Sequence, residues 1–251
     1  RLEIDPEMQA NSLTKQKRRA LVELLKAFSI EITGKLESEP YVAMTRQTLR
    51  KFRVFATPDF IKGGRTYHSP KSVQVEGDCS NAAFFQAAYQ LGNPVMTVCP
   101  LETDSVQGDR VAAHLLFELK HHQTIDASDI PDLVPILSVM AAANQGAVFT
   151  NVERLRLKES DRVESTIAML KALGGSAEAT ADTLTVFGTG LTGGTVRSYN
   201  DHRIAMSAAI AATVCDQPVT ILGAECVEKS YPRFWDEYRR LGGIYLDDSP
   251  A

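Results

Sequence analysis

The sequence predicts an α/β protein of the α+β type, in which mixed sheets are covered by helices. Strand patterns alternate with helical patterns along most of the chain, and hairpins interrupt this alternation. The order strand, helix, strand, helix and hairpin recurs, which indicates a repeated unit of about 60 residues.

The start of the chain differs from the rest. Residues 16–26 are basic and compatible with a helix, whereas residues 28–33 alternate like a half-exposed strand. The apolar spacing then predicts a helix over 41–52, which is followed by a strand around 53–57 and a glycine turn at 63–64.

From residue 72 onward the expected elements become regular. The predicted strands lie at 72–75, 95–99, 147–151 and 218–222, with a hairpin formed by 177–179 and 184–187. The predicted helices lie at 82–91, 107–119, 133–143, 161–173, 202–214 and 232–241.

The composition limits the classes of function. The chain has 251 residues, 44% hydrophobic and 23% charged, as is ordinary for one or two globular domains. A net charge of -4 and a pI near 5.8 argue against nucleic acid as the main partner. The sequence shows no membrane-length apolar run, no signal peptide and no C-x-x-C pair. We therefore expect a cytoplasmic protein with reduced thiols and no membrane contact.

Basic residues stand at three predicted helix starts, where the helix dipole disfavours positive charge: Lys158 with Arg162, His202 with Arg203, and Lys229. Backbone N–H groups at a helix start, together with a guanidinium or an ammonium, bind carboxylate and phosphate oxygens. Three such starts in one chain suggest a shared anion. Each motif alone also fits a solvated helix start, and a lone His202 also fits a structural histidine.

Caps can be assigned to the same helices from their sequences. The expected N-cap is Ser160 for the helix at 161–173, and Asp201 or Asn200 for the helix at 202–214. For the helix at 232–241 it is Ser230. Asp129 and Asp132 precede a further helix, where acidic residues are ordinary caps. A carboxylate that faces three cationic helix starts can also accept a proton. Both interpretations of Asp132 stay open at this point.

Five runs together resemble the 5-enolpyruvylshikimate-3-phosphate synthase family. They are V-E-G-D-C-S at 75–80, D-I-P-D-L at 129–133, L-K-E-S-D-R at 157–162, Y-N-D-H-R-I-A-M at 199–206 and E-K-S-Y-P at 228–232. Their order and spacing also match, and the resemblance covers residues 29–238. It implies an enolpyruvyl transferase fold of two lobes, built from repeated helix-and-sheet units whose helix N-termini point into the cleft.

The resemblance also implies a reaction. The family transfers the enolpyruvyl group of phosphoenolpyruvate to the 5-hydroxyl of shikimate 3-phosphate and releases phosphate, without a metal or an organic cofactor. Glu159 would exchange protons with the methylene carbon of phosphoenolpyruvate. Asp132 would take the proton of the attacking hydroxyl, and Lys158 would contact shikimate phosphate and bridging oxygens.

The remaining site residues would bind the substrates. The resemblance implies that Arg162 and Arg203 clamp the carboxylate of phosphoenolpyruvate, while His202 and Lys229 line its phosphate. In the first lobe, Ser38 would hold the shikimate phosphate and Tyr41 would lie near the shikimate ring. Arg154 is grouped with the substrate-binding residues, although the family commonly has Asn or Ala at that position. A monomer is expected.

Several family segments do not occur in this sequence. The P-x-K-S-x-x-x-R, N-x-G-T, R-P-M-x-P and S-S-Q segments are not found before Ser29, and a second gap lies between Leu119 and Ile125. Residues 1–27 are therefore an unmatched head, 28–74 a fragment of the N-terminal lobe, and 75–251 the C-terminal lobe.

Two alternatives to the synthase remain. One is a catalytically incomplete lobe that binds anions. The other is a UDP-N-acetylglucosamine enolpyruvyl transferase, which shares the fold and chemistry but lacks the L-K-E-S-D-R run.

Overall fold

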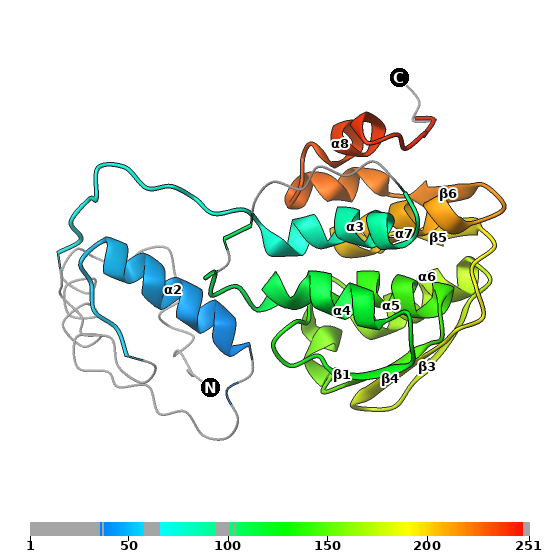
Figure 1. The fold of residues 1–251 in the computed structure, drawn as a ribbon, viewed down its shortest axis with the longest axis horizontal. Helices are drawn as coiled ribbons and strands as arrows, with labels where there is room; N and C mark the ends of the chain where they lie inside the picture. The colour runs from blue at the N-terminus through cyan, green and yellow to red at the C-terminus, as the bar shows by residue number, and fades with distance from the viewer. Residues whose placement is uncertain (1–35, 37, 58–65, 94–100, 103, 248–251) are drawn as a thin grey trace, which may run out of the picture. The chain divides into compact units, whose positions relative to one another are not determined.

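The computed structural model describes residues 36, 38–57, 66–93, 101–102 and 104–247. The chain divides into two compact units, Arg1–Gln74 and Val75–Ala251, and each is described by itself (Figure 1). The elements expected at 16–26, 28–33, 63–64 and 95–99, together with Cys99, lie outside the described residues.

The first unit contains helix α2, Glu39–Lys51, which confirms the helix expected at 41–52. The chain then turns through a left-handed residue, Arg53, at a φ of 61°. This turn brings the N–H of Val54 to the carbonyl of Leu49 at 2.9 Å. Of the strand expected at 53–57, only an isolated bridge at Ala56 forms.

A four-stranded mixed sheet organises the second unit. It consists of β1 (Gln123–Asp126), β2 (Ala147–Thr150), β3 (Ser176–Ala179) and β4 (Thr183–Phe187), in the order β1-β2-β4-β3. β1 and β2 run parallel, whereas β4 is antiparallel to both of its neighbours, as expected for mixed sheets. Ile125, Phe149 and Leu184 are register partners and are all buried, so this row faces the helices.

The strand and helix order repeats within this unit. The first copy runs β1, α5 (Val134–Ala143), β2, α6 (Arg162–Ala172) and the hairpin β3–β4. The second runs β5 (Gly194–Arg197), α7 (His202–Ala211, continued as η4, Ala212–Val214), β6 (Val219–Leu222) and α8 (Phe234–Arg240). β5 and β6 pair in parallel, as β1 and β2 do. The copies begin at Gln123 and Gly194.

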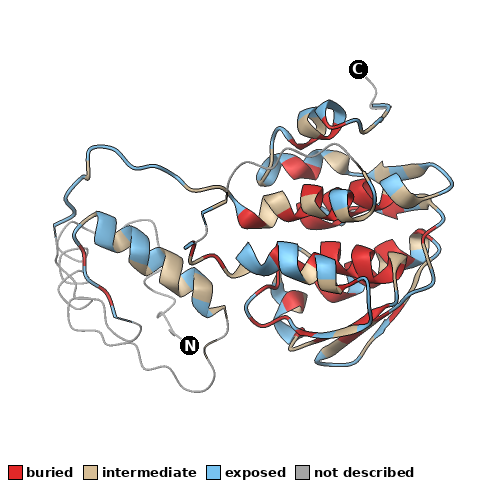
Figure 2. Cartoon of the chain, in the orientation of Figure 1, coloured by how far each residue is buried: buried red, intermediate tan, exposed pale blue. Residues whose placement is uncertain are grey.

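The core lies among the central helices. Each residue of α7 is buried, and α5 is buried except at its last residue (Figure 2). Against them pack α3 (Cys79–Gln90) and α4 (Ala112–Glu118), the latter preceded by the short helix η2, Gly108–Val111. The small apolar side chains of α7 let the helices approach closely, and the polar start of α7 is therefore held close to the starts of its neighbours.

The pattern of hydrophobic residues did not predict two of the strands that form, and it predicted a second strand, at 72–75, that does not form. β1 and β5 each contain a single buried residue, Ile125 and Val196, so their alternation is too short to recognise. Their parallel partners hold them in place. Residues 72–75 have no regular structure, with Val75 86% exposed. No described strand pairs with them.

Two further expectations can be compared with the described residues. Cys79, Cys215 and Cys226 are free thiols, in agreement with the expected reduced state. Among the helices described, none combines the length and the apolar character that crossing a membrane requires.

Gly146, which follows α5, provides a test of the packing between α5 and β4. Its φ is +80°, and an added Cβ would lie 2.5 Å from the carbonyl oxygen of Val186. Gly190 has a φ of +77° but nothing within 4 Å of such a Cβ. We expect Gly190→Ala to cost about 1 kcal/mol of unfolding free energy for its backbone alone. Gly146→Ala should cost about 2–4 kcal/mol, since the strand must also shift.

Urea unfolding of both glycine variants measures this difference. Equal losses in the two variants would show that β4 yields to the added methyl group without cost.

Candidate active site

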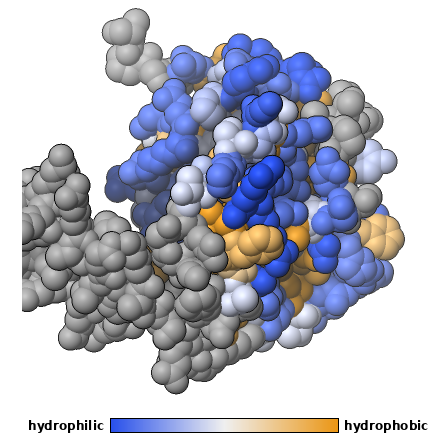
Figure 3. Space-filling model, turned by 90° about the vertical axis from the view of Figure 1, so that its left-hand side faces the viewer, coloured by the Kyte–Doolittle hydropathy of each residue, from blue (hydrophilic) through white to orange (hydrophobic). Residues whose placement is uncertain are grey.

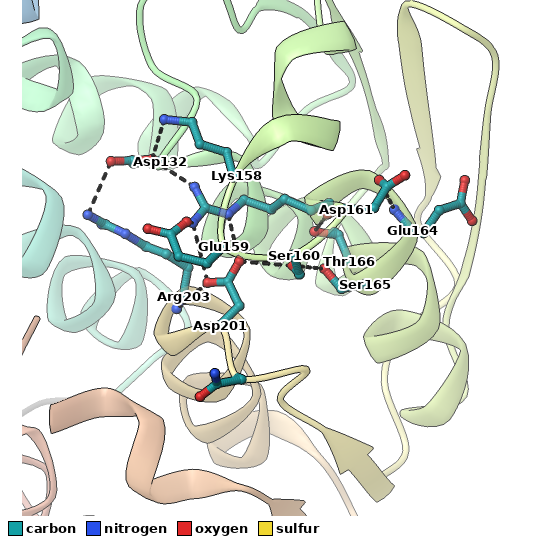
Figure 4. A network of polar contacts seen from close by, with 12 residues as sticks. Asp132, Lys158, Glu159, Ser160, Asp161, Glu164, Ser165, Thr166, Asp201 and Arg203 are labelled. Carbon is teal, nitrogen blue, oxygen red and sulfur yellow. Dashed lines mark hydrogen bonds and ion pairs between the residues drawn. The ribbon is translucent and has the colours of Figure 1, made fainter. Parts of the chain in front are cut away.

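The candidate site lies where α6 and α7 begin and where the chain turns into α5. Arg162 is the first residue of α6, Arg203 is the second of α7, and Asp132 stands two residues before α5. Figure 4 shows Asp132, Lys158, Glu159, Asp201 and Arg203 converging on one another. Five residues implied by the family resemblance are therefore brought together: Asp132, Lys158, Glu159, Arg162 and Arg203.

Arg162 is the centre of this cluster, and its side chain is fully buried. Its Nε donates to Oδ2 of Asp201 at 3.0 Å, and its Nη1 donates to Oδ1 of Asp132 at 2.7 Å. Its Nη2 donates to Glu159. Burial lowers the pKa of Arg162, but attraction and hydrogen bonding to Asp201, with further attraction to Asp132 and Glu159, raise it overall. The guanidinium is thus held charged in the interior.

Asp201 connects the starts of two helices. It caps α7, as expected, by accepting the N–H of Arg203 at 2.9 Å, and it also accepts the hydroxyl of Ser160 at 3.0 Å. Tyr199 and Asn200 precede it at φ values of 53° and 58°, which turn the chain sharply into α7. Its role as the counter-ion of Arg162 was missed from the sequence. A buried arginine requires a carboxylate partner, but burial of Arg162 could not be read from its position.

Asp132 receives three cations and does not cap a helix. Its Oδ1 lies 2.7 Å from Arg162 Nη1 and 3.3 Å from Lys158 Nζ, and its Oδ2 lies 3.3 Å from Arg203 Nη2. The N-cap position of α5 belongs to Leu133, and no side chain caps that helix. The interpretation of Asp129 and Asp132 as caps is therefore wrong. Asp129 is exposed, while Asp132 is used in ion pairs.

The cluster opens to solvent on the side of Lys158 and Glu159. Their side chains are 27% and 41% exposed, whereas the Arg203 side chain is 7% exposed. In the space-filling view of Figure 3, hydrophilic side chains cover most of the coloured face and hydrophobic patches lie between them. Carboxylates already bind the guanidinium of Arg162, so an anion that binds Arg162 must displace one of them.

Arg203 and His202 retain buried polar atoms that can serve a ligand. Within the described part of the chain, Arg203 Nε and Nη1 and His202 Nδ1 have no hydrogen-bond partner. Burial, and then the neighbouring Arg203 charge, lower the pKa of His202, so the imidazole is neutral near pH 7. A hydrogen bond to an anion stabilises a buried donor that has no partner more than it stabilises a donor that is exposed to water.

Contacts of the residues on either side hold the loop that carries Lys158 and Glu159. Asp161, not Ser160, is the N-cap of α6, since its side chain accepts the N–H of Glu164. Arg156, in the short helix η3 (Glu153–Leu157), contacts Asp161 and Glu164, each at 3.1 Å. Ser160, which was expected to cap the helix, instead bonds Asp201. Arg156 was not recognised from the sequence, where it is one of several basic residues.

Lys229 does not stand at a helix start. It ends the short helix η5, Ala224–Lys229, and α8 begins only at Phe234, with Arg233 at its N-cap position. The expected cap at Ser230 and the third cationic helix start are therefore wrong. Lys229 Nζ nevertheless donates to the carbonyl of Asn200 at 2.8 Å, so it contacts the turn that precedes Asp201.

Three further predicted residues are described each in its own element. Ser38 and Tyr41 stand at the start of α2 in the unit Arg1–Gln74, where Ser38 has a φ of 56° and Tyr41 is 37% exposed. Arg154 is exposed in η3. Their roles stay predictions.

Solved structures of enolpyruvyl transferases share this fold. An EPSP synthase structure from Acinetobacter baumannii matches with a TM-score of 0.60 at 23% identity, over 86% of this chain and 56% of that chain. The enolpyruvyl transferase NikO from Streptomyces tendae matches with a TM-score of 0.60 at 17% identity, over 83% and 54%. The expected enolpyruvyl transferase fold is thus confirmed.

The family follows from the sequence comparisons. The family model of EPSP synthase (3-phosphoshikimate 1-carboxyvinyltransferase) matches residues 20–238, and the chain belongs to this family. The chain is 40% identical to the 3-phosphoshikimate 1-carboxyvinyltransferase of Clostridium kluyveri and 42% identical to that of Clostridium acetobutylicum. Each match covers 85% of this chain and 55% of the relative. The chain therefore spans about half the length of the curated relatives it matches.

Replacement of Arg156 tests how the Lys158–Glu159 loop is held. Because the Arg156 ion pairs are partly exposed, we expect Arg156→Ala to lower the unfolding free energy by about 1 kcal/mol or less. Amide hydrogen exchange of residues 158–160 should accelerate more than this global loss explains. Arg233→Ala removes the exposed pair with Glu237 and serves as the control. Unchanged exchange in the Arg156 variant would contradict the fastening role.

Proposed function

We propose that this chain is part of an enzyme that transfers the enolpyruvyl group of phosphoenolpyruvate to the 5-hydroxyl of shikimate 3-phosphate. The products are 5-enolpyruvylshikimate 3-phosphate and phosphate, in the route to chorismate and the aromatic amino acids. The observation that carries the proposal is the cluster in which Asp132 and Glu159 surround Arg162 beside Lys158 and Arg203. The proposal includes a monomeric enzyme in the cytoplasm.

The charges of the cluster suit the anionic substrates. Phosphoenolpyruvate carries a carboxylate and a phosphate, which planar guanidinium groups bind by paired hydrogen bonds. In the proposal, Arg162 and Arg203 bind the carboxylate, and His202 and Lys229 line the phosphate. The two unpartnered nitrogens of Arg203 support this assignment, since they are buried donors ready for an acceptor.

The proposal assigns the proton transfers to two carboxylates. The 5-hydroxyl oxygen attacks C2 of phosphoenolpyruvate, Asp132 accepts the hydroxyl proton, and Glu159 delivers a proton to C3. In the elimination step a C3 proton returns to Glu159 as the bond to the phosphate oxygen breaks. Glu159 is suited to this task, as its side chain is 41% exposed at the open side of the cluster.

In the proposal, Asp132 can accept the hydroxyl proton only after the cations that contact it have moved away. Before the substrates bind, its two oxygens are shared among Arg162, Lys158 and Arg203. Substrate anions draw these cations away and leave a carboxylate oxygen open to the hydroxyl. Lys158 then contacts the shikimate phosphate and the bridging oxygen, where it stabilises developing charge.

The family resemblance assigns three further residues to substrate binding. In the proposal Ser38 binds the shikimate phosphate and Tyr41 lies near the ring, while Arg154 assists in substrate binding from η3. These assignments rest on the family resemblance.

A second candidate is an anion-binding lobe that does not turn over. The observation that favours it is the coverage of only 55% of each relative's length. Phosphate release from phosphoenolpyruvate with shikimate 3-phosphate distinguishes the two candidates. Turnover supports the synthase, whereas a purified, folded chain without turnover supports the incomplete lobe. UDP-N-acetylglucosamine should not replace shikimate 3-phosphate.

Glu159→Gln tests the assigned proton transfer. The variant keeps the shape of the side chain but cannot exchange the proton, so turnover should fall by roughly 10²–10⁴-fold while folding is retained. Phosphate release measures turnover, and circular dichroism checks the fold. Glu178→Gln, an exposed position on β3, is the matched control and should keep its activity. Near-normal turnover in Glu159→Gln would remove this residue from the mechanism.

A further inference from the structure

Asp109 is a buried carboxyl group that the proposed reaction does not use. It lies in η2 and is 3% exposed. Its Oδ2 accepts a hydrogen bond from Ser80 of α3, whereas its Oδ1 has no partner within the described residues. A buried carboxyl oxygen without a partner is unfavourable, so this position calls for a reason beyond packing.

Helix α3 contacts both Asp109 and Arg203. Ser80, which holds Asp109, and Phe84 are one turn apart and share a face of α3. The Arg203 guanidinium lies over the Phe84 ring, 6.0 Å from its centroid. Asp109 and Arg203 therefore contact the same side of this helix. Both have polar atoms without a partner, which are Oδ1 of Asp109 and Nε and Nη1 of Arg203.

The charges around Asp109 place its ionisation near neutral pH. Burial raises the pKa of Asp109 to about 6, and the Ser80 hydrogen bond opposes this rise. Asp132, from the turn before α5, and Asp78, at the start of α3, raise the pKa further, while Arg203 of α7 lowers it. A small change in pH thus adds or removes a negative charge beside Arg203.

We propose that Asp109 is a positioning residue that sets the pH dependence of anion binding at Arg203. When Asp109 is protonated, the two unpartnered guanidinium nitrogens are available to an anion. When Asp109 is ionised, its Oδ1 competes for them and its charge repels the anion. The inference deepens the proposed function, because it concerns the same arginine, but it requires only that an anion binds there.

Sulfate is a suitable probe, since its charge does not change between pH 5 and pH 8. Isothermal titration of the full chain should show roughly tenfold tighter sulfate binding at pH 5 than at pH 7.5. Asp109→Asn should bind sulfate at pH 7.5 nearly as tightly as the wild type does at pH 5. Only the weaker dependence that arises from His202, which adjoins Arg203, should remain. Asp216→Asn, an exposed position after η4, should behave as the wild type.

Two further variants keep the inference testable. Arg203→Ala should abolish the pH-dependent part of sulfate binding. If Asp109→Asn does not fold, Ser80→Ala provides the second test. It removes the hydrogen bond that favours the ionised form, so the transition in sulfate affinity should move to higher pH.

The inference is overturned if Asp109→Asn keeps the wild-type pH dependence, if Ser80→Ala leaves the transition in place, or if the wild type does not bind sulfate at pH 5. Sulfate binding requires no turnover. A chain that binds sulfate as expected but releases no phosphate would therefore count against the proposed function alone.

Discussion

The buried ion pair between Arg162 and Asp201 is the interaction on which the site depends. Both side chains are fully buried, so neither charge is compensated by water. Breaking such a pair by removing one partner typically costs about 3–5 kcal/mol, because the other charge is left alone in the interior. The pair fixes the first residue of α6 against the cap of α7. Asp132 and Glu159 then add further contacts to the same guanidinium.

Opposite charges also orient the cations of the site. Asp132 holds Arg162, Lys158 and Arg203 within 3.3 Å and so keeps them oriented toward a common point. Without a carboxylate at this position, the three cations would repel one another. Asp132 is therefore the shared counter-ion of all three cations.

Much of the second unit could be predicted from hydrophobic periodicity, because its helices and hairpin bury regular patterns. The strands β1 and β5 could not, since pairing with neighbours far along the chain stabilises them. The same distinction holds in the site. Arg162 and Arg203 could be recognised from charge at helix starts, whereas Asp201 as counter-ion, Arg156 and Asp109 depend on contacts between segments. Lys229 was misplaced because Pro232 and Ser230 suggested an earlier start for α8.

The double role of Asp201 has a consequence for motion. One carboxylate bonds the backbone of α7 and the side chain of Arg162 on α6. Sliding or rotation of one helix against the other would break a cap and an ion pair together. The two helices should therefore move as a single rigid body. Within this cluster, adjustment to a ligand is then left to the partly exposed side chains of Lys158 and Glu159 at its solvent-facing rim.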